Sequence, residues 1–352
     1  MERKWRNLVR TIAFVIICCL VFFYIQELLR AKWGEGTPGA HETTNAQGFY
    51  DLANNSMDVL CVGSSQIFYN LSPLVMWEKY GFTSYVRGSA NQTPLLSYYT
   101  IKDMLMTQNP QVIVFEVGRM VNSFNLSEDE WAARRGLDYM KLSPIKLEAV
   151  LALNEGKFPI SYIFPLLRYH TRWKELSKTD FEYFSWDHHN WTKGQYMGIS
   201  ILDFQWPENY MQKNDNFFEL PEENIYYLEK IIELCANREI ELLLFKAPSG
   251  AWNYTMHNSI CQLADKYQIT FVDYCLPEYI AETKIDDKTD FYYNQYHLRT
   301  TGAEKVSIHF GQYLKELFNL PNHKEPPLTS TYVDWDTDIQ SYHKFKAQNG
   351  LE

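Results

Sequence analysis

The stretch Asp58-Val59-Leu60-Cys61-Val62-Gly63-Ser64-Ser65 decides how this chain folds. Its four apolar residues, bounded by Asp58 and Gly63, predict a short strand that is buried on both faces, as in a parallel sheet. The residue that leaves the carboxyl end of such a strand points into the crevice where open α/β sheets bind ligands. Ser65 is therefore a candidate for chemistry, although the serines could instead serve only to cap the helix that follows.

Strand and helix patterns alternate along most of the chain. The expected strands are Val59–Val62, Ser84–Arg87, Val112–Val117, Glu241–Phe245 and Ile269–Asp273, and the expected helices include Pro94–Met106, Glu222–Ala236 and Trp252–Tyr267. Such alternation is typical of a parallel sheet with helices on both faces. We therefore predict an α/β fold, a flavodoxin-like doubly wound parallel sheet of about five strands.

The alternation stops in the region of residues 120–220, which predicts a mostly helical insertion after the third strand. The region is rich in aromatic residues, which could line a glycan surface but more often form the core of an insertion. Its histidines His170, His188 and His189 lack the carboxylate–histidine spacing of a known metal site. We expect these histidines on the surface or in the core, and we expect no metal.

Length and composition limit the classes of function. The chain has 352 residues, of which 46% are hydrophobic and 16% aromatic, enough for one domain with a large core. Its net charge is −10, from 33 basic and 43 acidic side chains, which argues against nucleic acid as a partner. The six cysteines include no CxxC motif, so neither a zinc nor a redox motif is expected, and no cofactor is predicted.

The N-terminal region contains one long apolar segment. Residues 12–25 carry no charge, and neighbouring leucines extend them toward the roughly 20 residues that cross a bilayer. Four basic residues precede the segment, against one acidic residue, so the positive-inside rule predicts a cytoplasmic N-terminus at residues 1–10 and a membrane anchor at residues 11–29. A cleaved signal peptide is the alternative, but no small-residue cleavage site follows Ile25. The remainder of the chain is then expected to be extracytoplasmic.

A histidine far downstream strengthens the case for the serine. His297 opens the run His297-Leu298-Arg299-Thr300-Thr301-Gly302-Ala303, just before the last amphipathic helix. A serine nucleophile needs a base within hydrogen-bond reach and donors for an oxyanion, and these commonly come from different crevice loops. Gly88, at the end of the second strand, has no side chain to keep its N–H away from an oxyanion, although an ordinary turn glycine is the alternative.

Together, Gly63-Ser64-Ser65, Gly88 and His297 followed by Gly302-Ala303 resemble the SGNH/GDSL hydrolase superfamily, in the membrane-anchored branch that is similar to bacterial D-alanyl-transfer and polysaccharide O-acetylation proteins. The resemblance covers about residues 58–317. It implies that Ser65 is the nucleophile. It also implies that the N–H groups of Gly88 and Ser65 form the oxyanion hole.

The chain departs from the family pattern at the residue that orients the histidine. The family's last block is Asp-x-x-His, whereas this chain has Asn294-Gln295-Tyr296-His297. An amide can hold a histidine by a hydrogen bond but cannot stabilise an imidazolium by charge. Either Asn294 positions His297, or Asp290 takes that role, or the chain is slow or inert.

A second departure concerns the oxyanion hole. The family's oxyanion asparagine normally follows the third strand, where this chain has Val117-Gly118-Arg119. Asn91, close to Gly88 in the sequence, is the expected replacement.

The expected organisation after the anchor is a tether at residues 30–56, a catalytic domain at residues 57–320 and a C-terminal tail at residues 321–352. We predict a membrane-anchored, extracytoplasmic serine esterase or O-acyltransferase. We expect it to act on the acyl groups of cell-envelope glycans through an acyl-Ser65 intermediate. The acyl group is expected to be acetyl. By analogy with the family, a membrane-bound O-acyltransferase is the expected partner that supplies the acyl group.

Two other hypotheses stay open. One is a non-catalytic glycan-binding or scaffold subunit that keeps the fold with a decayed triad, and Asn294 is the feature that favours it. The other is a doubly wound domain without acyl chemistry, which requires the serine, glycine and histidine motifs to coincide by chance.

Overall fold

The computed structural model describes residues 2–32, 41–185, 188–325 and 332–351. Its centre is a sheet of five parallel strands in the order β2-β1-β3-β4-β5. The strands are β1 (Val59–Gly63), β2 (Ser84–Gly88), β3 (Val112–Glu116), β4 (Glu241–Lys246) and β5 (Thr270–Asp273). This order is that of a flavodoxin-like doubly wound sheet, and it confirms the predicted fold class.

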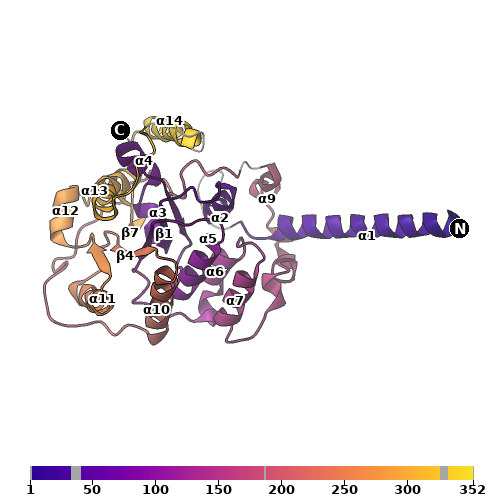
Figure 1. Cartoon of the computed structure of the whole chain (residues 1–352), viewed down its shortest axis with the longest axis horizontal. Helices are drawn as coiled ribbons and strands as arrows, with labels where there is room; N and C mark the ends of the chain where they lie inside the picture. The colour runs from indigo at the N-terminus through magenta and orange to yellow at the C-terminus, as the bar shows by residue number, and fades with distance from the viewer. Residues whose placement is uncertain (1, 33–40, 186–187, 326–331, 352) are drawn as a thin grey trace.

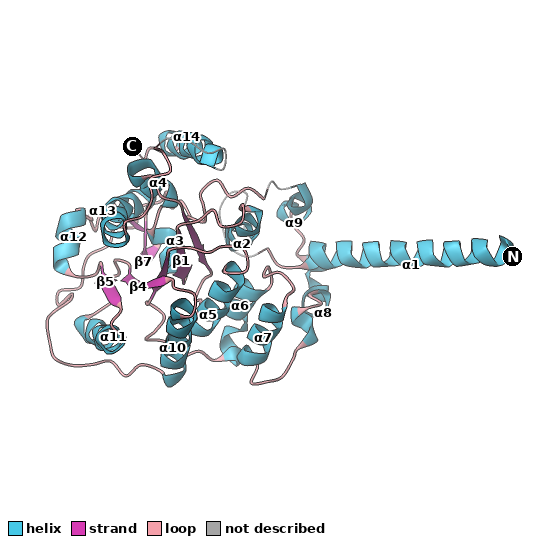
Figure 2. Cartoon of the chain, viewed as in Figure 1, coloured by secondary structure: helices cyan, strands magenta, loops and turns pink. Residues whose placement is uncertain are grey.

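Helices cover both faces of the sheet (Figures 1 and 2). They are α3 (Ser65–Asn70), α4 (Pro73–Tyr80), α5 (Pro94–Met104), α10 (Glu222–Ala236), α11 (Tyr254–Tyr267), α12 (Pro277–Thr283) and α13 (Thr300–Phe318). Alternate residues of a strand face opposite sides of the sheet. In β1, Leu60 and Val62 pack with α5, α10 and α11, whereas Val59 and Cys61 pack with α3 and α13. Two cores result, which is why every residue of β1 and β3 is buried.

A small hairpin follows the main sheet. It pairs β6 (Phe291–Tyr292) with β7 (Asn294–Leu298) in antiparallel orientation, and β7 leads directly into α13. The hairpin forms no ladder with the five-stranded sheet. It therefore carries its residues over the carboxyl edge of the sheet as a separate element.

The insertion after β3 is helical in its first part. It contains α6 (Leu126–Leu137), α7 (Pro144–Leu153), α8 (Leu166–Tyr169) and α9 (Lys178–Glu182), with three short 3-10 turns. Ala133, Val150 and Tyr162 pack with Leu96 of α5 in a third cluster, whereas Trp173 is exposed. The aromatic residues thus form the core of the insertion only in part. Between residues 190 and 220 the described chain has no helix or strand.

Two segments outside the predicted catalytic domain form helices: α2 (His41–Asp51) in the expected tether and α14 (Val333–Gln348) in the expected tail. The Asn45 side chain of α2 donates a hydrogen bond to the Val86 carbonyl of β2 at 2.9 Å. The Trp335 ring of α14 packs on Trp77 of α4, with ring centroids 5.0 Å apart. Through these contacts α2 and α14 pack on the globular body. Residues 33–40 of the expected tether lie outside the described residues.

α1 (Glu2–Leu29) projects from the body as one helix of 28 residues (Figure 1). It is long and apolar enough to cross a membrane, and no residue of its most apolar window is buried. Length and hydropathy do not by themselves separate an anchor from a signal sequence, which has the same character.

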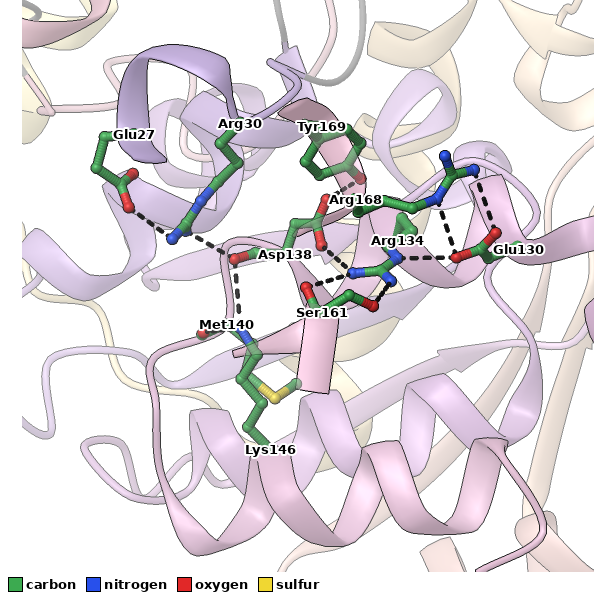
Figure 3. Close-up of polar contacts among 10 residues, drawn as sticks. All are labelled: Glu27, Arg30, Glu130, Arg134, Asp138, Met140, Lys146, Ser161, Arg168 and Tyr169. Carbon is green, nitrogen blue, oxygen red and sulfur yellow. Dashed lines mark hydrogen bonds and ion pairs between the residues drawn. The ribbon is translucent and has the colours of Figure 1, made fainter. Parts of the chain in front are cut away.

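The carboxyl end of α1 is joined to the insertion by a network of polar contacts (Figure 3). Arg30 pairs with Glu27 at 2.6 Å and donates a hydrogen bond to the Asp138 carbonyl at 2.9 Å. The buried Asp138 carboxylate accepts a hydrogen bond from the Tyr169 hydroxyl at 2.6 Å and lies 3.5 Å from the Arg134 guanidinium. These contacts fix the point at which α1 leaves the body.

Candidate active site

β1 delivers two serines that have different tasks. Ser64 precedes α3, and its hydroxyl accepts a hydrogen bond from the Gln66 N–H at 3.3 Å, which is the capping contact expected of serine. Ser65 is the first residue of α3 and is half-buried. Capping therefore belongs to Ser64, which leaves the Ser65 hydroxyl available for chemistry.

The Ser65 hydroxyl meets His297. Its Oγ lies 2.8 Å from His297 Nε2, although the two residues are 232 positions apart in the sequence. Asn70 of α3 holds the backbone on both sides of the histidine. Its Nδ2 donates to the Tyr296 carbonyl at 3.1 Å, and its Oδ1 accepts from the Leu298 N–H at 2.7 Å. Asn70 is not among the residues that the sequence predicts for the site, because both of its partners are remote in the chain.

The environment keeps the His297 ring neutral. The Tyr69 ring stacks on the imidazole, with centroids 4.0 Å apart and an interplanar angle of 14°. Burial and the nearby positive charge of Lys246 lower the pKa of His297 to about 4. At neutral pH the imidazole can therefore accept a proton from Ser65.

Neither residue expected to orient His297 reaches it. Asn294 Oδ1 accepts a hydrogen bond from the Tyr296 N–H at 2.9 Å, a local turn that occupies the side-chain oxygen. Asp290 is buried and pairs with Lys305 at 2.5 Å. Within the described part of the chain, His297 Nδ1 is buried and has no hydrogen-bond partner. The structure therefore holds a serine–histidine pair in which neither Asn294 nor Asp290 contacts the His297 ring, so a role of either residue in orienting the ring stays a prediction.

A buried ion pair lies beside the serines. Glu116 ends β3 and Lys246 ends β4, each is 1% exposed, and Lys246 Nζ is 3.9 Å from Glu116 Oε1. Lys246 also donates to the Gln66 side chain at 2.5 Å, and Glu116 accepts from the Ser64 hydroxyl at 2.9 Å. The pair thus ties the residues on both sides of Ser65 to the ends of two strands. In the sequence, each member of the pair is recognisable as a charged residue at the end of an otherwise apolar strand. The carboxyl ends of such strands are where the ligand crevice lies.

Gly88 ends β2 next to the end of β1, in register with Gly63. A Cβ on Gly88 would lie 2.5 Å from the Gly63 carbonyl oxygen and 2.9 Å from a methyl carbon of Ile67. No side chain fits there, so close approach of two strands, and not a turn, explains the glycine. The Gly88 backbone is thereby adjacent to the peptide that leads into Ser65, where a donor to an oxyanion has to lie.

Two cavities meet at the Ser65–His297 pair. The first cavity has a volume of about 370 Å³, and its other lining residues include Arg119, Lys246, Trp252, Asn294 and Tyr296. The second cavity has a volume of about 620 Å³, and its other lining residues include His41, Glu42, Trp131, Arg135, Tyr196 and Tyr292. Ser65, His297 and Asn91 line both. Asn91, which has a positive φ of 55°, is therefore brought to the pair from the loop after β2.

The histidines of the insertion do not gather into a metal site. His170 and His188 are exposed, and His189 pairs with Asp338 at 2.8 Å. Among the residues that the structure describes, no group of three or more His, Cys, Asp or Glu side chains could hold a metal ion.

Comparison with known proteins adds little to this geometry. No protein-family model matches the chain, and no curated protein matches it. Among solved structures, the chain is similar to one from Bacteroides fragilis that carries a provisional description as an acylhydrolase. The two are 12% identical, the match covers 78% of this chain and 95% of the other, and the TM-score is 0.36. A likeness at this level carries no argument about activity, so the chemistry of the site rests on its own residues.

Proposed function

We propose that this protein is a serine esterase or O-acyltransferase in which Ser65 attacks an acyl ester and His297 takes the proton of the serine. The observation that carries the proposal is the 2.8 Å contact between Ser65 Oγ and His297 Nε2. It lies at the edge of the sheet where open α/β proteins bind their ligands. Because the pKa of His297 is lowered to about 4, the ring is unprotonated and acts as a base at neutral pH.

The proposed reaction has two halves. Ser65 Oγ bonds to the ester carbonyl carbon while its proton passes to His297 Nε2, and the N–H groups of Ser65 and Gly88, with Asn91, stabilise the oxyanion. The C–O bond to the alcohol then breaks, and His297 returns the proton to the alcohol oxygen. In the second half, water or a sugar hydroxyl attacks acyl-Ser65 while His297 takes its proton. The bond between the acyl carbon and Ser65 Oγ then breaks, and His297 returns the proton to Oγ.

The two cavities favour transfer over simple hydrolysis. An acyl donor in one cavity and an acceptor in the other both reach the same serine without exchanging places. The second cavity also offers aromatic faces, from Trp131, Tyr196 and Tyr292, on which a sugar ring can pack. The acyl group in this proposal is acetyl, the acceptor is a cell-envelope glycan, and a membrane-bound O-acyltransferase supplies the acyl group.

In the same proposal α1 is a retained anchor with a cytoplasmic N-terminus and an extracytoplasmic body. Lys178, whose side chain is 87% exposed, is a suitable reporter position. In a chain whose exposed cysteines are replaced by serine, a cysteine at this position should react with a membrane-impermeant maleimide on intact cells. Protection until the cells are lysed would contradict the topology.

A non-catalytic glycan-binding or scaffold subunit is the second candidate. The observation in its favour is the unpartnered Nδ1 of His297. Without a carboxylate at Nδ1, the imidazolium that forms during acyl transfer has no charged partner, and this slows turnover.

The two candidates separate when full-length protein in detergent is treated with p-nitrophenyl acetate and with a fluorophosphonate. An enzyme releases p-nitrophenol, and mass spectrometry finds the fluorophosphonate adduct on Ser65. A folded protein that gives neither adduct nor ester cleavage would support the scaffold instead.

A further inference from the structure

The first cavity contains an arginine whose side chain has no hydrogen-bond or ion-pair partner among the residues that the structure describes. Arg119 follows β3 and lines this cavity together with Ser65 and His297. Its Nε is buried without a hydrogen bond, and no carboxylate of the described residues lies within 4 Å of its guanidinium. Arg87 shows the contrast, because this buried arginine pairs with Asp103 at 2.7 Å.

The carboxylates whose charges act on Arg119 are engaged elsewhere. Burial lowers the pKa of Arg119, and Asp129 and Glu116 oppose that effect through their charges. Glu116 pairs with Lys246 and accepts hydrogen bonds from the Ser64 hydroxyl and the Gly118 N–H. Asp129 accepts a hydrogen bond from the Asn125 N–H at 3.2 Å. A second positive charge, that of Lys246, lines the same cavity.

The loop that carries Arg119 is held in place. Asn224, which is buried in α10, donates hydrogen bonds to the carbonyl oxygens of Arg119, Met120 and Asn122 at 3.3, 3.0 and 2.9 Å. Met120 is fully buried, and the Val117 N–H bonds to the Phe245 carbonyl at 2.9 Å. A cation is therefore kept at a defined position in the cavity, and its loop is not free to carry it out to solvent.

We propose that Arg119 binds an anionic group, a carboxylate or a phosphate, on the substrate whose ester reacts at Ser65. This inference rests on the proposed function and names its substrate class: acyl esters of acidic sugars. Arg119 is partly buried, and its enclosed Nε has no hydrogen bond among the described residues, so an incoming anion offsets the cost of removing this charge from water. The planar fork of arginine donates two parallel hydrogen bonds to a carboxylate or phosphate, which neutral sugars cannot match. Since the protein has a net charge of −10, this local positive charge is what attracts an acidic substrate.

Three matched esters test the proposal: glucose, glucuronate and glucose 6-phosphate, each acetylated at the same hydroxyl. For the wild type, kcat/KM should be about ten- to a hundredfold higher for at least one of the acidic esters than for acetylated glucose. Arg119→Gln should abolish this preference by raising KM for the acidic esters, and Arg119→Lys should restore part of it. Arg238→Gln, an equal charge change at an exposed position outside both cavities, is the control and should keep the preference.

Binding measured without turnover separates this inference from the proposed function. Calorimetry on Ser65→Ala should show tighter binding of glucuronate or glucose 6-phosphate than of glucose, and the additional change Arg119→Gln should remove the difference. This result can hold even where no ester is cleaved, so failure of the acyl chemistry and failure of anion recognition are distinguishable. Equal binding of neutral and acidic sugars would overturn the inference. So would an equal loss of kcat on all three esters in Arg119→Gln, which would make Arg119 an oxyanion donor instead.

Discussion

Among the described residues, His297 contacts a serine hydroxyl and His257 contacts a cysteine sulfur, and the two rings differ in what lies at Nδ1. His297 contacts Ser65 through Nε2, and its Nδ1 has no hydrogen-bond partner among the described residues. His257 of α11 contacts the Cys261 sulfur through Nε2 at 3.2 Å and the Asp273 carboxylate through Nδ1 at 2.8 Å. Cys261, His257 and Asp273 therefore resemble a complete triad, whereas Ser65 and His297 at the carboxyl end of β1 do not.

The pKa values of the two rings move in opposite directions. Burial by itself lowers the pKa of each ring. At His297 the positive charge of Lys246 lowers it further, to about 4. At His257 the hydrogen bonds with Asp273 and Cys261 outweigh burial and raise the pKa to about 9. The Asp273 carboxylate is the stronger of the two influences that raise the pKa of His257, and His297 has no such carboxylate among the described residues. His257 is protonated at neutral pH and serves structure, whereas His297 stays neutral and can accept a proton.

The largest expected effect comes from Ser65→Ala. Ser65→Ala should lower ester turnover by about 10³-fold or more and abolish fluorophosphonate labelling, while the thermal melt stays nearly unchanged. Cys261→Ala is the matched control beside the other histidine, and it should leave turnover as in the wild type. Labelling that persists in Ser65→Ala, or an adduct on Ser64, would show that another residue is the nucleophile.

The two rings should also give opposite pH dependences of stability. The pKa of His257 in the folded state, about 9, is above its unfolded value of 6.5, so its stabilisation is complete below pH 6.5 and is lost as the pH rises to 9. The pKa of His297, about 4, is below 6.5, so its stabilisation is complete above pH 6.5 and is lost as the pH falls to 4. Each of these two pH-dependent changes in the free energy of unfolding, the alkaline limb and the acid limb, is at most about 3 kcal/mol.

Urea unfolding between pH 4 and pH 9.5 measures both limbs. His257→Gln should remove the loss of stability on the alkaline side and leave the acid side as it is. An unchanged alkaline limb in this variant would mean that Asp273 does not hold a protonated ring.

Asp290→Asn tests whether this buried carboxylate belongs to structure or to the site. We expect the free energy of unfolding to fall by about 1–3 kcal/mol, because Asp290 pairs with Lys305 and accepts a hydrogen bond from the Thr301 hydroxyl. Since its carboxylate is used in these contacts, kcat should change by no more than about twofold. A large loss of kcat with unchanged stability would restore Asp290 as the residue that orients His297.

The smallest effect is expected from Asn294→Asp. A carboxylate there keeps the turn with the Tyr296 N–H and does not reach His297 Nδ1, so the rate should change by less than about threefold. A gain of tenfold or more, with the pH–rate profile shifted to a higher pKa, would show that residue 294 turns toward the ring during the reaction.

Much of the fold is predictable from local pattern. The five strands begin and end within one residue of the predicted ranges, because short apolar runs with charges or glycines at their ends leave little choice of boundary. Glu222–Ala236 is predicted with its observed bounds. By contrast, α2 (His41–Asp51) has no apolar period of its own, and it is a helix because β2 supplies contacts such as that from Asn45 to Val86.

The site is predictable only where a residue type is itself the signal. A serine after a buried strand and a histidine before a helix identify Ser65 and His297, which the structure brings together. Glu116 and Lys246 meet because β3 and β4 are neighbours in the sheet, although the two residues are 130 positions apart in the sequence. Neither strand's own sequence specifies the order of strands in the sheet. The Asn294 side chain can either form its local turn or point toward the His297 ring. The spacing of these residues in the sequence does not decide between the two.

The contacts of Arg30 with Asp138 and Glu27 affect how far the site can move relative to α1. A flexible linker lets a catalytic body sample a wide volume around its anchor. If α1 lies in a bilayer as proposed, these contacts would instead limit the heights and tilts at which Ser65 can lie above the lipid surface. Under the proposed function, a polymeric acceptor would then be acylated only where it passes at such a height.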